Sequence, residues 1–119
     1  MDYSKYETLL FEKRDRVLTV TLNRPEKLNA IDGAMHVELS HVFEDINRDR
    51  SVDIVILTGA GRAFCAGGDI KDMAGARQQA AEGDPEAFLR LNRRFGEMIS
   101  TANRLPQVLI TVLEGAVMG

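Results

Sequence analysis

The chain has 119 residues, 45% hydrophobic and 28% charged, which is typical of a globular protein of at most one domain. A net charge of −3 without clustered lysine or arginine excludes a basic surface for nucleic acid, and the single cysteine excludes an internal disulfide. No apolar run has transmembrane length and the N-terminus resembles no signal or transit peptide, so we expect a cytoplasmic protein without membrane association.

Two strands are predicted near the N-terminus, over residues 7–13 and 17–22, with a polar turn at 14–16 between them. In the second strand, Thr19 and Thr21 alternate with apolar neighbours, which is the period-two pattern of a strand with one buried face.

A helix is predicted over residues 33–48, with Asp32 as its N-cap. Its apolar side chains recur on one face, which we expect to be buried: Met35, Leu39, Val42, Phe43 and Ile46. His36 and His41 lie off this stripe, and we expect both to be solvated.

Buried strands are predicted over residues 54–57 and 108–113. Between them, Asp84 and Pro85 predict the start of a helix, with the aspartate as cap and the proline in the first turn. The core face of this helix comprises Phe88, Leu91, Phe95, Met98, Ala102 and Leu105, and Pro106 ends it. Residues 73–83 show no periodic apolar face, and we expect them to form a mobile lip.

The loop that follows the apolar run 54–57 is the most informative segment. It contains Gly59, Gly61, Gly67 and Gly68, and glycine allows a backbone to approach a ligand closely. Free N–H groups in such a turn can face an anionic oxygen, so the loop is a candidate oxyanion hole. A glycine pair in isolation is more often a simple turn.

Three other loop motifs fail on specific residues. A dinucleotide fingerprint would need glycine at Phe64, and a Walker loop would need lysine where Asp69 follows Gly68. A nucleophile elbow needs serine, and the only side chain near its place is Cys65, which we expect to be a small packing residue.

Three stretches, in order, resemble the enoyl-CoA hydratase/isomerase (crotonase) family. Residues 20–31 contain Asn-Arg-Pro and then Asn-Ala, and residues 64–70, Phe-Cys-Ala-Gly-Gly-Asp-Ile, are similar to the first oxyanion loop of the family. Residues 105–119 are similar to the strand and turn that lead to its second oxyanion glycine. Each motif is moderately specific, but their order and spread over the chain make the resemblance strong.

The resemblance implies a fold and an assembly. Pattern alone indicates only an α/β protein, whereas the family fold is a superhelix of repeated β-β-α units. Family members are more than twice as long, so we expect residues 1–119 to be the N-terminal part of one acyl-CoA-binding domain, incomplete at the C-terminus. The resemblance also implies a homotrimer or hexamer, no metal site, and no cofactor beyond the coenzyme A of the thioester substrate.

The resemblance also assigns site residues. The expected oxyanion donor is the N–H of Gly68, and Gly119 matches the first glycine of the run that supplies the second donor. The residues expected to lie along coenzyme A are Lys27, Leu28, Ala30, Ala66, Gly68, Asp69, Ile70 and Lys71. Asp69 is more readily interpreted as a helix cap than as a general base. Lys27 or Lys71 could pair with a phosphate, although a solvated surface role fits each equally well.

The implied activity is that of an enoyl-CoA hydratase, which adds water to a 2-enoyl-CoA thioester. An isomerase, or another crotonase-type lyase or hydrolase, would share every residue named above. A non-catalytic acyl-CoA-binding module is the alternative from a different class. The two glutamates of family hydratases lie beyond the position of Gly119, so no glutamate of this chain is assigned to acid–base catalysis.

Overall fold

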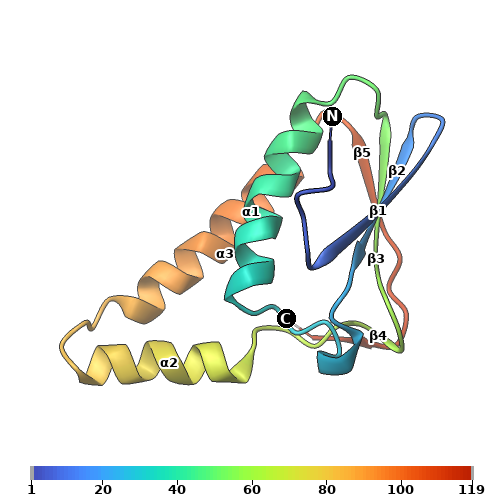
Figure 1. The fold of residues 1–119 in the computed structure, drawn as a ribbon. Coiled ribbons are helices and arrows are strands. Elements are labelled where there is room, and N and C mark those ends of the chain that lie inside the picture. The colour runs from blue at the N-terminus through green and yellow to red at the C-terminus, as the bar shows by residue number, and fades with distance from the viewer. Residues whose placement is uncertain (1, 119) are drawn as a thin grey trace.

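The computed structural model describes residues 2–118, whose strands and helices follow the order β-β-α, β-β-α-α, β-β (Figure 1). The strands are β1 (Leu9–Arg14), β2 (Val17–Leu22), β3 (Ile54–Gly59), β4 (Ala63–Cys65), β5 (Val108–Thr111) and β6 (Ala116–Val117). The helices are a 3-10 turn (Pro25–Lys27), α1 (Gly33–Arg48), α2 (Ile70–Ala81) and α3 (Ala87–Asn103). The α/β class and the repeated β-β-α order are as predicted.

The strands of residues 2–118 form two sheets. The larger has the order β1-β2-β3-β5, with β1 antiparallel to β2 and the other two pairings parallel. The smaller pairs β4 with β6 in parallel. Helix α1 covers one face of the larger sheet (Figure 1). Because β2, β3 and β5 are parallel, the loops that follow β2 and β3 leave from the same end of the sheet, where the carboxyl ends of these strands lie.

Helix α1 forms as predicted. The Asp32 carboxylate accepts the N–H of Met35 at 2.9 Å, and every residue of the predicted apolar stripe is buried. The expectation for His36 is wrong. Only 3% of its surface is exposed, because α3 packs beside α1 and the ring of Phe95 stacks on the imidazole. His41 is exposed, as expected.

The region after residue 69 departs most from the predictions. Most of the predicted lip at 73–83 belongs to α2, which Asp69 caps and which buries only Ala76. This helix has no apolar stripe for a pattern to reveal; its alanines and glutamines are good helix formers. Helix α3 begins at Ala87, later than predicted, and Asp84 contributes through its carbonyl, which accepts the Ala87 N–H at 3.2 Å. Phe88 is 36% exposed and is not a core residue.

The two strands predicted to be buried are less covered than expected. In β3 only Val55 is fully buried: Ile54 and Ile56 point to the other face of the sheet, and Leu57, on the same face as Val55, is partly buried against the core. Strand β5 is at the edge of the sheet within residues 2–118, which leaves Val108 and Ile110 59% and 46% exposed. Within the same range, no helix is long and apolar enough to cross a membrane.

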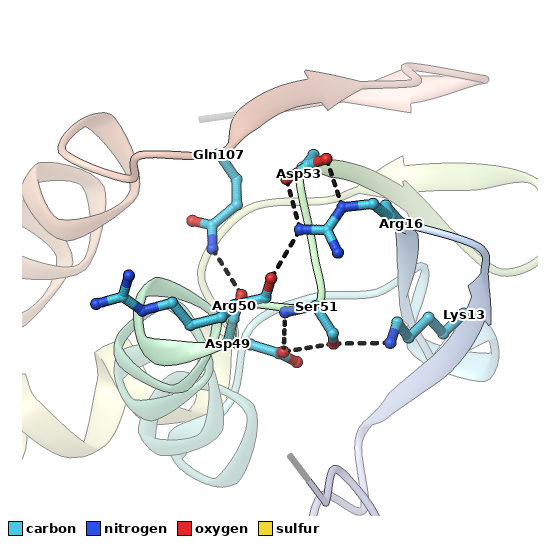
Figure 2. Close-up of polar contacts among 7 residues, drawn as sticks. All are labelled: Lys13, Arg16, Asp49, Arg50, Ser51, Asp53 and Gln107. Carbon is cyan, nitrogen blue, oxygen red and sulfur yellow. Dashed lines mark hydrogen bonds and ion pairs between the residues drawn. The ribbon is translucent and has the colours of Figure 1, made fainter.

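A polar network holds the turn between α1 and β3 (Figure 2). Oδ1 of Asp49 accepts the N–H and the hydroxyl of Ser51 at 2.9 and 2.6 Å, and the same hydroxyl accepts from Lys13 of β1 at 2.7 Å. The other carboxylate oxygen of Asp49 accepts the Tyr3 hydroxyl at 2.7 Å. The network therefore ties the N-terminal segment and β1 to the end of α1.

The same network reaches β2 and the start of β5 (Figure 2). Arg16 donates to both carboxylate oxygens of Asp53, at 2.6 and 3.0 Å, and to the Arg50 carbonyl at 2.7 Å. Gln107 donates to the carbonyls of Ile46 and Asp49, at 2.6 and 3.3 Å, which satisfies the end of α1. These contacts fix the end of the sheet at which β2, β3 and β5 begin. The opposite end, where these strands finish, carries the loops discussed below.

The Asp49 contacts predict a specific acid sensitivity. Burial alone would raise the pKa of Asp49, but the hydrogen bonds from Ser51 and Tyr3 outweigh it and hold this pKa at about 2, below the ordinary 3.8. Their stabilisation is therefore complete above about pH 4 and is lost as the pH falls toward 2. In the full-length protein, Asp49→Asn should lower the urea midpoint of unfolding at pH 6. At pH 2.5 the difference in midpoint between wild type and variant should be smaller. A constant difference at both pH values would contradict this, and exposed Glu44→Gln is the control.

Candidate functional site

The loop after β3 requires glycine at its start. A Cβ atom on Gly59 would lie 2.5 Å from the Phe64 carbonyl oxygen and 2.7 Å from that of Ala63. A Cβ on Gly115 would lie 1.9 Å from the Arg62 carbonyl oxygen. Neither distance is possible for a side chain, so glycine allows three backbone segments to pack against one another here.

Asn29 joins the segment after β2 to this loop. The side chain is fully buried, and its Nδ2 donates to the carbonyls of Ala60 and Ala63, both at 2.9 Å. Its Oδ1 accepts the N–H of Arg24 at 2.8 Å. The residue has φ of 56°, a conformation that asparagine tolerates better than most residues. The sequence placed Asn29 in a family motif without assigning this role.

Residues 28–31 run alongside residues 66–69. The Leu28 carbonyl accepts the Ala66 N–H at 3.0 Å, and the Gly67 carbonyl accepts the Ile31 N–H at 2.8 Å. The Ile31 carbonyl accepts the Asp69 N–H at 2.9 Å. These bonds place the two predicted coenzyme A segments side by side.

The N–H of Gly68 has a different environment. Gly68 lies opposite Ile31 in a parallel bridge, but the two hydrogen bonds of this bridge are made by the Gly67 carbonyl and the Asp69 N–H. The N–H of Gly68 itself therefore points away from Ile31. No acceptor for this N–H is found within residues 2–118. The Gly67 N–H, by contrast, meets the Sγ of buried Cys65 at 3.3 Å, and Cys65 packs in the core as expected.

Asp69 acts as a helix cap. Its carboxylate accepts the N–H groups of Lys71 and Asp72 at 2.9 and 3.4 Å, and it lies 3.7 Å from the guanidinium of Arg24. Arg24 also lies 3.5 Å from Asp32 and donates to the Ala30 carbonyl. Both helix starts, those of α1 and α2, are thus tied to the turn after β2. These contacts favour the cap interpretation of Asp69 over the general-base one.

Two hollows meet at this loop. The first, of about 470 Å³, lies between the turn after β2 and the start of α2. The predicted coenzyme A residues that line it are Lys27, Ala30, Ala66, Gly68, Asp69, Ile70 and Lys71. Leu28, also predicted to lie along coenzyme A, is not among the lining residues; its carbonyl accepts the Ala66 N–H. We call this space the outer hollow.

The second space, of about 560 Å³, lies between α1, α2 and α3 and is called the helix cavity. Its lining includes Met73, Leu91 and Phe95, together with the charged residues Arg90 and Arg94. Gly68 and Asp69 line both spaces. A group bound at Gly68 can therefore extend into either of them.

Gly119, the first glycine of the run expected to supply the second oxyanion donor, lies outside the described residues. The chain leading to it is described: β6 pairs with β4, and the Met118 N–H donates to the Cys65 carbonyl at 3.0 Å. The approach to the second position thus runs beside the approach to Gly68. Within residues 2–118, no group of three or more histidine, cysteine, aspartate or glutamate residues is placed to hold a metal ion.

Known proteins are similar to this chain in sequence and in fold. A sequence profile described as Enoyl-CoA hydratase/isomerase matches residues 17–119. The chain is 33% identical over 114 residues to the 1,2-epoxyphenylacetyl-CoA isomerase of Escherichia coli K12, covering 95% of this chain and 42% of that protein. It is 46% identical over 70 residues to a probable enoyl-CoA hydratase of Rhizobium meliloti, covering 59% of this chain and 27% of that protein.

A solved structure agrees with these relatives. The crystal structure of an enoyl-CoA hydratase/isomerase from Marinobacter aquaeolei matches with a TM-score of 0.85 and 51% identity, covering 94% of this chain and 43% of that one. The fold is therefore of the crotonase type. The chain belongs to the enoyl-CoA hydratase/isomerase family, and it spans about two fifths of the length of the E. coli relative.

The role of Asn29 predicts a large loss of stability on its removal. Asn29→Ala eliminates three hydrogen bonds of a fully buried side chain, which should lower the free energy of unfolding by about 2–4 kcal/mol. Denaturant unfolding of the full-length variant measures this loss, with exposed Asn47→Ala as the matched control. Equal stability of the two variants would show that Asn29 does not hold the loop.

Proposed function

We propose that the full-length protein is an enoyl-CoA hydratase-like enzyme that adds water to the double bond of a 2-enoyl-CoA thioester. In this proposal the N–H of Gly68 is one of two donors to the thioester carbonyl oxygen. The observation that carries it is the unpaired Gly68 N–H at the junction of the outer hollow and the helix cavity.

The chemistry needs such a donor because charge develops on the thioester oxygen. When the oxygen of water bonds to the β-carbon, the electrons of the double bond move toward the carbonyl and form an enolate. Proton transfer to the α-carbon then restores the thioester. A backbone N–H aimed at the developing charge contributes about 2.7–4 kcal/mol to stabilising the transition state. The second donor is proposed to follow Gly119, as are the groups that move the protons.

Coenzyme A is assigned to the outer hollow. Lys27 and Lys71 line it and can pair with phosphate groups as point charges. Ile70 is 82% exposed there, although an isoleucine is usually buried. Packing of the pantetheine arm over Ile70 would remove this apolar surface from water. The acyl group is assigned to the helix cavity.

Other crotonase-type reactions remain alternatives. The E. coli relative is by name an isomerase and the Rhizobium relative a probable hydratase, so relatives differ in reaction. A non-catalytic acyl-CoA-binding module would use the same two hollows. Two acidic residues facing the thioester from the residues that follow the glycine run would favour the hydratase, and their absence would favour the alternatives.

The assembly and the location are also proposals. We propose a homotrimer or a pair of trimers in the cytoplasm, supported by the family resemblance and by the composition. Sedimentation of the full-length protein as a monomer would contradict the assembly.

Substitutions at Gly68 test the oxyanion role. Gly68→Ala should retain most of the activity, because alanine keeps the N–H and its Cβ would lie an acceptable 3.4 Å from the Met73 sulfur. Gly68→Pro removes the donor and should lower turnover by about 10²–10³. Circular dichroism and acyl-CoA binding must show that the proline variant is folded and binds ligand. Near-normal turnover in such a variant would refute the assignment.

Charge removal tests the placement of coenzyme A. Lys27→Ala and Lys71→Ala should each weaken acyl-CoA binding by about 1.4- to 5-fold, because exposed ion pairs contribute about 0.2–1 kcal/mol. The loss should shrink at high salt, where the charges are screened. Calorimetry at two salt concentrations measures both effects. Lys13→Ala, in the network at the opposite edge of the sheet, is the control, and equal weakening by all three variants would oppose the placement.

A further inference from the structure

His36 is a buried polar residue whose presence the fold does not explain. Its side chain is 3% exposed on α1, and its Nε2 atom is buried without a hydrogen-bond partner within residues 2–118. The ring of Phe95 stacks on it, with centroids 4.1 Å apart and planes inclined by 17°. An unpaired buried nitrogen destabilises a protein, and an apolar side chain of similar size would avoid this loss. The nitrogen therefore calls for a partner outside the described chain.

The position of His36 indicates which partner it meets. Both His36 and Phe95 line the helix cavity, and Gly68 lines the same cavity. An acyl group whose thioester oxygen is held at Gly68 would thus extend along walls that include the imidazole. The cavity is also lined by charged side chains of both signs, namely Arg94, Asp72 and the ion pair of Arg90 with Asp84, whereas a site for a plain hydrocarbon chain is predominantly apolar.

We infer that the helix cavity takes an acyl group bearing an oxygen of its own, beyond the thioester, and that Nε2 of His36 recognises this oxygen. The shared chemistry is a hydroxyl, carbonyl or carboxylate oxygen. Phe95, which is only partly buried, must rotate from its stacked position to admit it, and such side-chain rotations are fast. The inference rests on the proposed function, since it places the thioester at Gly68.

The protonation state of His36 suits this role. Burial lowers the pKa of His36, and the positive charge of Arg94 lowers it further. Hydrogen bonding to the Arg94 backbone and the negative charge of Asp72 raise this pKa, but by less. The ring is therefore neutral at pH 7. A neutral imidazole offers one N–H donor and one acceptor nitrogen, so Nε2 can donate to any of these oxygens or accept from a hydroxyl. A hydrocarbon chain would leave it unpaired.

The test is a comparison of acyl-CoAs of matched length. Calorimetry on the full-length protein would use hexanoyl-CoA, its 4-, 5- and 6-hydroxy derivatives, and adipoyl-CoA, which ends in a carboxylate. At least one oxygenated ligand should bind about 2- to 10-fold more tightly than hexanoyl-CoA, as one added hydrogen bond predicts. The hydroxyl and carboxylate arms distinguish a neutral oxygen from an anion.

Variants then assign the preference to His36. His36→Leu should abolish the preference for the oxygenated ligand over hexanoyl-CoA, and His36→Gln, which keeps donor and acceptor groups, should retain part of this preference. His41→Leu alters an exposed histidine of the same helix and should leave all affinities unchanged.

Two results would overturn the inference and leave the proposed function standing. One is that wild-type protein binds hexanoyl-CoA at least as tightly as every oxygenated ligand, a result that needs no variant. The other is that the preference survives in folded His36→Leu. If no acyl-CoA binds to the folded protein, the proposed function fails, and this inference fails with it.

Discussion

The candidate site depends on the backbone pairing of residues 28–31 with residues 66–69. Parallel alignment of β2 and β3 brings these segments to one edge of the sheet, and three N–H to carbonyl bonds then hold them together. In this pairing the Gly67 carbonyl and the Asp69 N–H bond to Ile31, and the Gly68 N–H between them points away from Ile31. The geometry of its neighbours thus leaves the Gly68 N–H available for the oxyanion role that we propose, a role that needs no side chain.

The surroundings of this pairing keep it rigid. Asn29 fills the space beneath it with three hydrogen bonds, and Gly59 admits backbone where a side chain would collide. Arg24 and Asp69 connect the turn after β2 to the start of α2. Rigidity matters because an oxyanion donor is effective only when it is positioned before the charge forms. The polar network around Asp49 fixes the end of the sheet at which the parallel strands begin, so the strands that carry the site loops are held at their opposite end.

The sequence predicted the elements whose signals are local. Strand β2 and helix α1 occupy the predicted residues, because alternation in the one and the Asp32 cap with an apolar stripe in the other are complete within each segment. Helix α2 was missed because it has almost no buried face, and Asp69, although recognised as a cap, was not connected to it. His36 was misplaced because its burial comes from Phe95, 59 positions away in the chain, and no pattern within α1 contains that contact. The motifs indicated two segments that the structure places side by side at the candidate site, whereas the role of Asn29 required the loop geometry.

The most direct test of this account is a crystal structure of the full-length protein with hexanoyl-CoA, a saturated ligand that cannot be hydrated. The account predicts that the thioester oxygen lies about 2.7–3.1 Å from the backbone nitrogen of Gly68. It also predicts that the coenzyme A moiety occupies the outer hollow beside Ile70. A thioester oxygen bound elsewhere, with the Gly68 N–H paired to another protein group, would contradict it.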